Sequence, residues 1–270
     1  MGCKLCHSPS QLCDSHIVPE FMYEPLYDNK HRIIFVTEEE GRPNREKPLQ
    51  RGIRERLLCS ACEGEINRQY EQPNVRVWRG FVEQRPVRGI SVTPVRGDDG
   101  SWAVHVGGFD YARFKLLLLS VLWRASVAGG QDYTEVALGP HEERLCKMLL
   151  EKDAGTQADY PCLFYVFTEP TFGLMARPAG IKLDGYTSYQ FLLPGVLLWF
   201  VIGDRTRPYP MAKFAPKEDG SLIAPFVRPD EVPLVKHAAR AVQKLARLEN
   251  ERSMTSPGAA AAPERCDGAR

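Results

Sequence analysis

The feature that most constrains this chain is a pair of Cys-x-x-Cys sequences in its N-terminal quarter. The first pair is Cys3 and Cys6, and the second pair is Cys59 and Cys62. In a Cys-x-x-Cys turn, both thiolates can reach one tetrahedral ion, with Zn–S distances of about 2.3 Å. Two pairs at this spacing arise together by chance far less often than one. We therefore expect the four thiolates to share one structural Zn²⁺.

Two other uses of these cysteines stay open from the sequence. A redox-active Cys-x-x-Cys follows a strand and needs only one pair. Cys13 and His16 also have the spacing of metal ligands, so they offer a way to close a zinc site with the first pair alone. That arrangement would leave the second pair without a metal.

Composition and apolar patterning bound the class of protein. The N-terminus lacks a charged region followed by an apolar run, so we expect a cytoplasmic protein whose 8 cysteines do not form a disulfide framework. The apolar runs at 116–123 and 191–202 are shorter than the roughly 20 residues that cross a bilayer, so no membrane partner is expected. The net charge of +1 gives no global attraction to nucleic acid. Any nucleic-acid contact must therefore come from a local patch.

The second cysteine pair lies where a strand is followed by a helix. Leu57 and Leu58 indicate the end of a strand, and the residues after Cys62 recur at helical spacing. That helical face consists of Glu63, Ile66, Asn67 and Tyr70. A knuckle, a hairpin and a helix that donates the last two ligands form a treble clef. Zinc binding, which is worth about 10–16 kcal/mol in small zinc modules, would stabilise a segment that has few core residues.

The rest of the chain predicts a larger mixed domain. Alternating apolar residues are typical of strands at 74–84 and of a hairpin at 90–106, and strand-like runs follow at 162–168 and 189–203. Helical patterns cover 110–128, 139–155 and 228–253. Arg124 lies in the first of these helices, where a buried arginine needs a carboxylate partner that the sequence does not identify.

These patterns define an expected α+β fold with three parts. Residues 1–72 form the zinc-bound treble clef of ββα-metal type, and residues 73–252 form a mixed α/β domain to which the sequence assigns no role. Residues 253–270 have the composition of a disordered tail.

Three short sequences resemble the HNH endonuclease family. They are CKLC from Cys3, DSHIVP from Asp14 and LLCSACE from Leu57, and the similarity covers about residues 3–71. The chain looks like a divergent member, similar to uncharacterised bacterial HNH-like proteins. The resemblance implies a treble clef whose four cysteines hold structural zinc, and a family association with bacterial defence.

The resemblance also implies a catalytic site. His16 falls on the general base that activates water, and Glu63 stands where the family has a metal-binding His. Ser15 occupies the position of the metal-binding Asp, with Asp14 one residue earlier, and Asn29 is a candidate for the Asn that orients the base. A Glu carboxylate can bind Mg²⁺ or Mn²⁺ as a catalytic metal, whereas a Ser hydroxyl binds a hard cation weakly.

The expected function is therefore metal-dependent cleavage of DNA phosphodiester bonds. From Arg42 to Arg56, six basic residues face two acidic ones, which favours phosphate contacts by a local strip. The candidate contacts are Arg45, Lys47, Arg51 and Arg54. An ordinary solvated loop has the same composition. The alternative function is a non-catalytic zinc module that recognises a nucleic acid or a protein partner.

Overall fold

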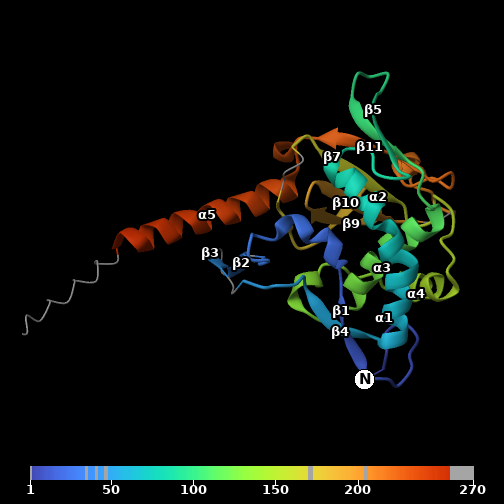
Figure 1. The fold of residues 1–270 in the computed structure, drawn as a ribbon, viewed down its shortest axis with the longest axis horizontal. Helices are drawn as coiled ribbons and strands as arrows, with labels where there is room; N and C mark the ends of the chain where they lie inside the picture. The colour runs from blue at the N-terminus through green and yellow to red at the C-terminus, as the bar shows by residue number, and fades with distance from the viewer. Residues whose placement is uncertain are drawn as a thin grey trace, which may run out of the picture.

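The larger part of the chain is built on one mixed sheet (Figure 1). The computed structural model describes residues 2–33, 36–39, 42–45, 48–169, 173–203 and 206–255. Neighbouring strands of the 7-stranded sheet are antiparallel, except that β11 and β7 are parallel. In spatial order the strands are β5 (Ser91–Arg96), β6 (Trp102–Gly107), β11 (Ser221–Val227), β7 (Cys162–Phe167), β10 (Val196–Ile202), β9 (Tyr186–Leu193) and β8 (Ala179–Leu183).

The N-terminal part contains two separate pairs of strands. Strand β1 (Leu12–His16) pairs antiparallel with β4 (Arg54–Cys59), which brings the two ends of the predicted zinc module together. Strands β2 (Val36–Glu39) and β3 (Arg42–Arg45) form a hairpin in the connection between them. The strand predicted before the second cysteine pair is thus confirmed.

One continuous helical segment connects the two parts of the chain. It consists of α1 (Ser60–Ile66), the π-helical turn η3 (Asn67–Glu71) and α2 (Gln72–Glu83). Ile66 and Tyr70 are buried, as the predicted helical face requires, whereas Asn67 is exposed. This segment passes through residue 72, where the sequence placed the end of the zinc module.

The prediction of a strand at 74–84 is wrong, because these residues form most of α2. Val77, Trp78 and Phe81 are buried and lie on one face of a helix. Pro73 follows the π-helical turn directly, at the start of α2. The run at 189–203 also differs from a single strand, because Pro194 and Gly195 turn the chain between β9 and β10.

The central helix of the fold is α3 (Tyr111–Val127), which the sequence predicted. Its first turn is capped because the Asp110 carboxylate accepts a hydrogen bond of 3.0 Å from the Arg113 N–H. Helix α4 (His141–Glu151) packs beside α3, as the contacts between the two helices show. Phe81 of α2, Phe114 of α3 and Phe164 of β7 stack on one another and join the helices to the sheet.

The hydrophobic core is continuous from the cysteine knuckle to the sheet. Leu5, Ile17 and Leu58 belong to the same buried cluster as the apolar residues of α3 and β7. The Cys146 thiol of α4 also donates to the Leu5 carbonyl oxygen over 3.3 Å. The division at residue 72 stays a prediction, and separate expression of residues 1–72 and 73–252 would test it.

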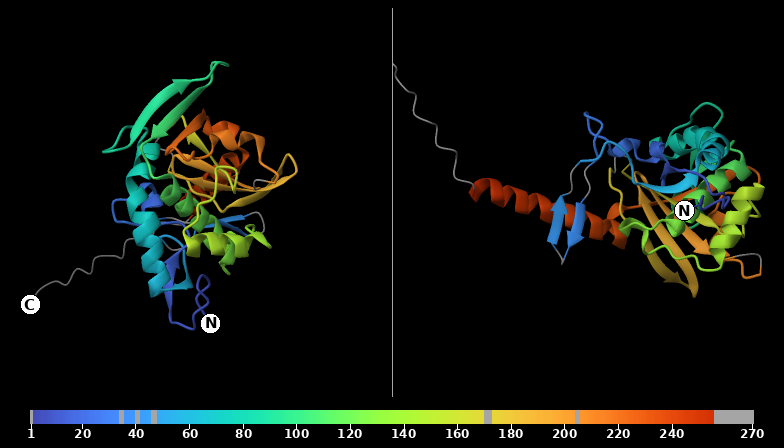
Figure 2. Two further views of the ribbon diagram at one scale, coloured as in Figure 1. Left: turned by 90° about the vertical axis from the view of Figure 1, so that its right-hand side faces the viewer. Right: turned by 90° about the horizontal axis from the view of Figure 1, so that it is seen from below.

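Helix α5 (Pro233–Thr255) extends away from this body (Figures 1 and 2). Val235, near its start, is buried, and further along the helix contacts the β2–β3 hairpin (Figure 2). The predicted tail begins inside this helix, since residues 253–255 end α5, and residues 256–270 lie outside the described residues. Within the described ranges, no helix is long and apolar enough to cross a membrane.

Candidate metal centre and adjoining polar site

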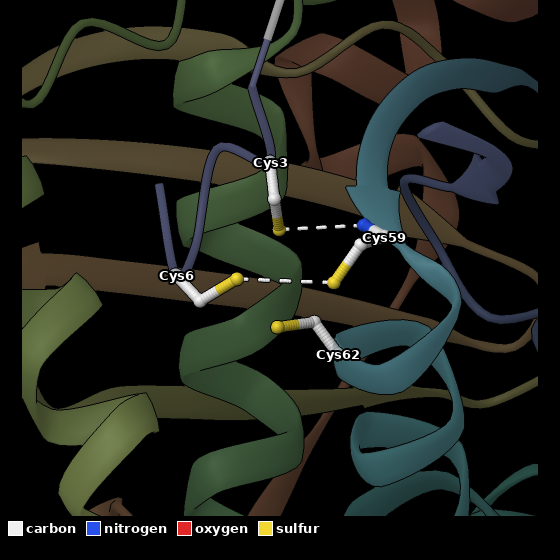
Figure 3. A group of neighbouring side chains, drawn as sticks. All are labelled: Cys3, Cys6, Cys59 and Cys62. Atoms are coloured by element: carbon white, nitrogen blue, oxygen red, sulfur yellow. Dashed lines mark hydrogen bonds between the residues drawn. The ribbon is translucent and has the colours of Figure 1, made fainter. Parts of the chain in front are cut away.

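The structure brings the four predicted zinc ligands together (Figure 3). The sulfur atoms of Cys3, Cys6, Cys59 and Cys62 all lie within 4.8 Å of one another and point toward a common centre. Tetrahedral zinc with four Zn–S bonds of about 2.3 Å places its sulfur atoms just under 4 Å apart, so the donor set suits this ion. The cluster is a four-cysteine site, and zinc is the metal that it fits best.

Local structure explains why these thiols converge. The first pair lies on a short turn in which the His7 N–H bonds the Cys3 carbonyl oxygen over 2.9 Å. Cys59 ends β4 and is the N-cap of α1, so Cys62 falls in the first helical turn. The Cys59 N–H donates to the Cys3 sulfur over 3.3 Å, which joins the two pairs directly.

The surroundings of the thiols favour thiolate at some positions and not at others. Hydrogen bonds from the side chain and backbone of Ser8 lower the pKa of the Cys6 thiol to about 6. The backbone N–H of Cys62 is the largest cause of a lowered pKa at Cys59. Burial and the neighbouring thiols raise the pKa of Cys62. A bound cation would stabilise all four thiolates at once.

The alternative zinc site with Cys13 and His16 does not form. Within the described part of the chain, the group of metal-ligating side chains contains the two Cys-x-x-Cys pairs and neither Cys13 nor His16. Cys13 is half-buried on β1, and the His16 ring has other partners. A redox role that needs one pair alone is also poorly suited to a cluster of four.

His16, the predicted general base, ends β1 close to two charged side chains. Its Nε2 lies 2.8 Å from Nε of Arg54, the residue opposite it on β4, and also contacts a carboxylate oxygen of Glu20. Burial is the largest cause that lowers the pKa of His16, followed by the Arg54 charge, while Glu20 opposes this change. The imidazole is therefore neutral near pH 7.

The two contacts at Nε2 exclude each other for a neutral ring. Arg54 can donate only to an unprotonated Nε2, whereas Glu20 can accept only from a protonated one. In the second state Nδ1 carries the lone pair, and Nδ1 makes no hydrogen bond to any residue in the described ranges. His16 thus has one tautomer that is held by Arg54 and one that is oriented by a carboxylate.

Glu20 is fixed as an anion beside His16. Burial acts to raise its pKa, but hydrogen bonds from the Tyr27 hydroxyl and the Gly52 N–H, together with His16, lower it overall. Sequence analysis did not single out Glu20. The signal was its position four residues after His16, immediately beyond Pro19.

Glu63, the predicted metal ligand, lies on a different side of β1 from the His16 ring. Burial, the largest cause, raises the pKa of Glu63, and the neighbouring hydroxyl of buried Ser15 opposes this change without meeting the geometry of a hydrogen bond. Ser15 Oγ and Glu63 Oε2 are both buried and lack hydrogen-bond partners among the described residues. No contact joins His16 and Glu63 within these residues. Glu63 of α1 lies beside Ser15, and the side chains of Ser15 and His16 point to opposite faces of β1.

A buried arginine holds the backbone at the end of β1. Arg124 of α3 is fully buried, and its Nη1 donates to the His16 carbonyl oxygen over 2.7 Å. The same atom lies 3.0 Å from Oε1 of Glu71, in the π-helical turn. Glu71 is therefore the carboxylate partner that sequence analysis required for Arg124. A π-helical turn often marks a functional position within a helix.

The remaining predicted residues occupy less specific positions. Asn29 and Asp14 are exposed, and the Asn29 side chain makes no hydrogen bond in the described ranges, so it does not orient His16 there. Arg51 is exposed, whereas Arg54 is half-buried against His16. Arg45 ends β3, and Lys47 lies outside the described residues. The structure thus brings Arg54 to the predicted base.

Comparison with protein-family models, with curated proteins and with solved structures found no match for this chain. The structure by itself defines an α+β protein with a four-cysteine site suited to zinc.

Proposed function

We propose that this protein is a divergent HNH-type hydrolase that cleaves phosphodiester bonds in DNA. The observation that carries the proposal is the contact of His16, at the end of β1, with the Glu20 carboxylate, beside strand β4, which ends at the four-cysteine cluster. A base whose ring is oriented by a fixed carboxylate is the arrangement that general-base catalysis needs. A role in bacterial defence follows from the family resemblance only.

The proposed proton transfer uses the tautomer in which Nε2 donates to Glu20. Nδ1 then takes a proton from a water molecule as that water oxygen bonds to phosphorus and the opposite P–O bond breaks. Arg54 cannot donate to Nε2 in this state. Its guanidinium is then available to a phosphate oxygen, which agrees with its predicted role as a phosphate contact.

The residues of this site suit the catalytic Mg²⁺ or Mn²⁺ of the proposal only in part. Ser15 Oγ and Glu63 Oε2 are buried oxygens without partners in the described ranges, and a hard cation would satisfy both. A cation held there would lie on a different side of β1 from the His16 ring, so these residues do not place it at a phosphate that is attacked from His16. Glu63, Ser15 and neighbouring Glu71 are the residues that would hold it.

One observation favours the second candidate function, a non-catalytic zinc module that recognises a nucleic acid or protein. Arg54 contacts His16 Nε2 directly, and apart from the four cysteines no group of three or more metal-ligating side chains occurs in the described part of the chain. On this interpretation, His16, Glu20 and Arg54 only hold β1 against β4.

The test is cleavage of supercoiled plasmid DNA by the purified full chain with added Mg²⁺ or Mn²⁺. We expect His16→Ala to lower the rate by at least about a hundredfold, the usual size of a general-base contribution. Glu20→Gln should also lower the rate, because it removes the charge that orients the ring. His237→Ala, a change at an exposed histidine of α5, is the control.

Each outcome separates the two candidates. Cleavage by the parent and by His237→Ala, with loss in His16→Ala, supports the hydrolase. A parent protein that leaves plasmid intact while retaining zinc supports the non-catalytic module. Equal cleavage by the parent and His16→Ala contradicts the assignment of His16 as the base.

A further inference from the structure

The β5–β6 hairpin projects from the body at the end far from the four-cysteine cluster (Figures 1 and 2). Its base packs against α2, since Gly80 lies close to Val92 and Ile90. Its outer half, around the turn at 97–101, is exposed. The hairpin therefore offers a surface that the zinc module does not use.

An exposed tryptophan lies near the tip of this hairpin. The Trp102 side chain is 54% exposed, more than any other large hydrophobic residue in the described ranges. Arg96, its cross-strand partner, places its guanidinium carbon 5.8 Å from the centre of the indole ring. An accessible aromatic face beside a cation is a stacking platform for a nucleobase.

Unpaired arginines continue this surface toward the base of the hairpin. From Arg76 to Arg96 the sequence contains five arginines and one acidic residue, Glu83. Arg79 pairs with Glu24, and Arg85 pairs with Glu83.

The three arginines left over have no carboxylate partner in the described ranges. Arg76 and Arg88 are exposed, and their side chains make no ion pair or hydrogen bond there. Arg76 Nη1 also lies near Gly89, the residue after Arg88 in the sequence. Arg96 makes a polar contact with the Gly100 carbonyl oxygen and the ring contact described above.

We propose that the β5–β6 hairpin binds a single-stranded nucleic acid, with a base stacked on Trp102 and phosphates at Arg76, Arg88 and Arg96. A single strand is favoured because its bases are free to stack, whereas those of a duplex are not. Gly89 and Arg96 are about 20 Å apart along an extended strand, which spans several phosphates. This inference rests on the proposed function for its link to cleavage, but the hairpin contacts do not involve His16.

Acidic residues limit where the strand lies. Asp98 and Asp99 occupy the turn, and the Asp99 carboxylate is held by the N–H and hydroxyl of Ser101 at 2.9 and 2.6 Å. The phosphates therefore follow the strands and the loop at 87–90 rather than the tip. We therefore expect the arginine charges and the stacking on Trp102 to contribute separately to the free energy of binding.

The experiment measures fluorescence anisotropy of a labelled oligothymidine of about 20 nucleotides, and of a duplex of equal length, with the full chain. No divalent metal is added, and a denaturing gel verifies that the oligonucleotide stays intact. Trp102→Ala should weaken single-strand binding between about fivefold and a hundredfold, with little change for the duplex. Arg88→Ala with Arg96→Ala should make the plot of log affinity against log salt shallower by about 1.4.

Leu150→Ala and Lys147→Ala are matched controls, because both side chains are exposed on α4. They should bind like the parent. Binding by the parent that is unchanged in the hairpin variants would overturn the proposal, as would a parent that does not bind the oligonucleotide at physiological salt. Binding without plasmid cleavage would support the hairpin surface while contradicting the hydrolase. Cleavage of plasmid without hairpin-dependent binding would do the reverse.

Discussion

The fully buried Arg124 forms an ion pair with the partly buried Glu71, with Nη1 and Oε1 3.0 Å apart, and the same guanidinium donates to the carbonyl oxygen of His16. This relationship joins three segments that are distant in sequence, namely α3, the π-helical turn and the end of β1. The position of the predicted base thus depends on a charge in the core of the larger domain. Sequence separation hid this connection, because residues 16, 71 and 124 belong to different predicted elements.

Breaking this pair should destabilise the protein more than removing both charges. Glu71→Gln leaves the Arg124 charge buried without compensation, and we expect a loss of about 3–5 kcal/mol in the free energy of unfolding. The double variant Arg124→Met with Glu71→Leu should cost less than the sum of its single changes. Urea unfolding of the single and double variants measures this.

The control for that prediction is the exposed pair between Arg79 and Glu24, whose side chains are about half exposed. Glu24→Gln should cost less than about 1 kcal/mol. If Glu71→Gln and Glu24→Gln lowered the free energy of unfolding equally, burial would not increase the contribution of Glu71 to stability.

Loss of zinc should have a large effect on folding. Cys59→Ser or a strong chelator removes a ligand or the ion, and we expect at least about 5 kcal/mol of stability to be lost, since structural zinc contributes more than that in small modules. Because the knuckle shares its core with α3 and α4, the loss should lower the melting temperature of the whole chain. Calorimetry with zinc analysis measures both quantities.

Cys13→Ser is the matched variant for this experiment, because Cys13 is half-buried on β1 and lies outside the cluster. It should retain one zinc ion per chain and melt near the parent. Zinc that stays bound in Cys59→Ser but is lost in Cys13→Ser would instead identify the other ligand set.

Gly220 should be intolerant of any side chain. Its φ is +75°, and an added Cβ would lie 2.1 Å from the Phe109 carbonyl oxygen, where β11 begins next to β6. Gly220→Ala should therefore cost more than about 3 kcal/mol, through strain and a clash with backbone. Thermal unfolding is a sufficient measurement.

Gly139 provides the comparison, with φ of +55° and open space around an added Cβ. Gly139→Ala should cost about 1–2 kcal/mol, the strain of a left-handed residue alone. If both alanine variants lost the same stability, the close approach at Gly220 would have no energetic role.

The start of α3 depends on Asp110. Asp110→Ala removes the acceptor for the Arg113 N–H and should cost about 1 kcal/mol. Asp110→Asn keeps an oxygen acceptor and should cost only a few tenths of that amount. Chemical denaturation of both variants separates capping from charge, since equal losses would assign the effect to the charge.

Elements with strong local signals were predictable from the sequence. Helix α3 has a capping Asp110 and ends before two glycines, and the hairpin at 90–106 has its Asp-Asp-Gly turn. The meeting of the two cysteine pairs was also predictable, because ligand spacing reports a long-range contact that hydrophobic periodicity does not. Alternation failed at 74–84, where valines at alternate positions, 75 and 77, gave a strand pattern to a helix that buries Trp78 and Phe81.

The candidate site was predictable only in part. His16 was identified through its flanking residues, but its partners Glu20 and Arg54 depend on strand register and on the turn after Pro19. Glu71 was hidden because a π-helical turn shifts the helical periodicity by one residue. No single-sequence pattern signals such a shift in advance.

The helical segment from Ser60 to Glu83 determines the spacing between the two ends of the molecule. It begins at the cysteine cluster and ends beside the β5–β6 hairpin, and at 1.5 Å per residue it spans about 35 Å. A stiff spacer of this kind sets which ligands can touch both ends at once. A polymer shorter than this length can contact only one end of the segment, whereas a longer one can contact both ends at once.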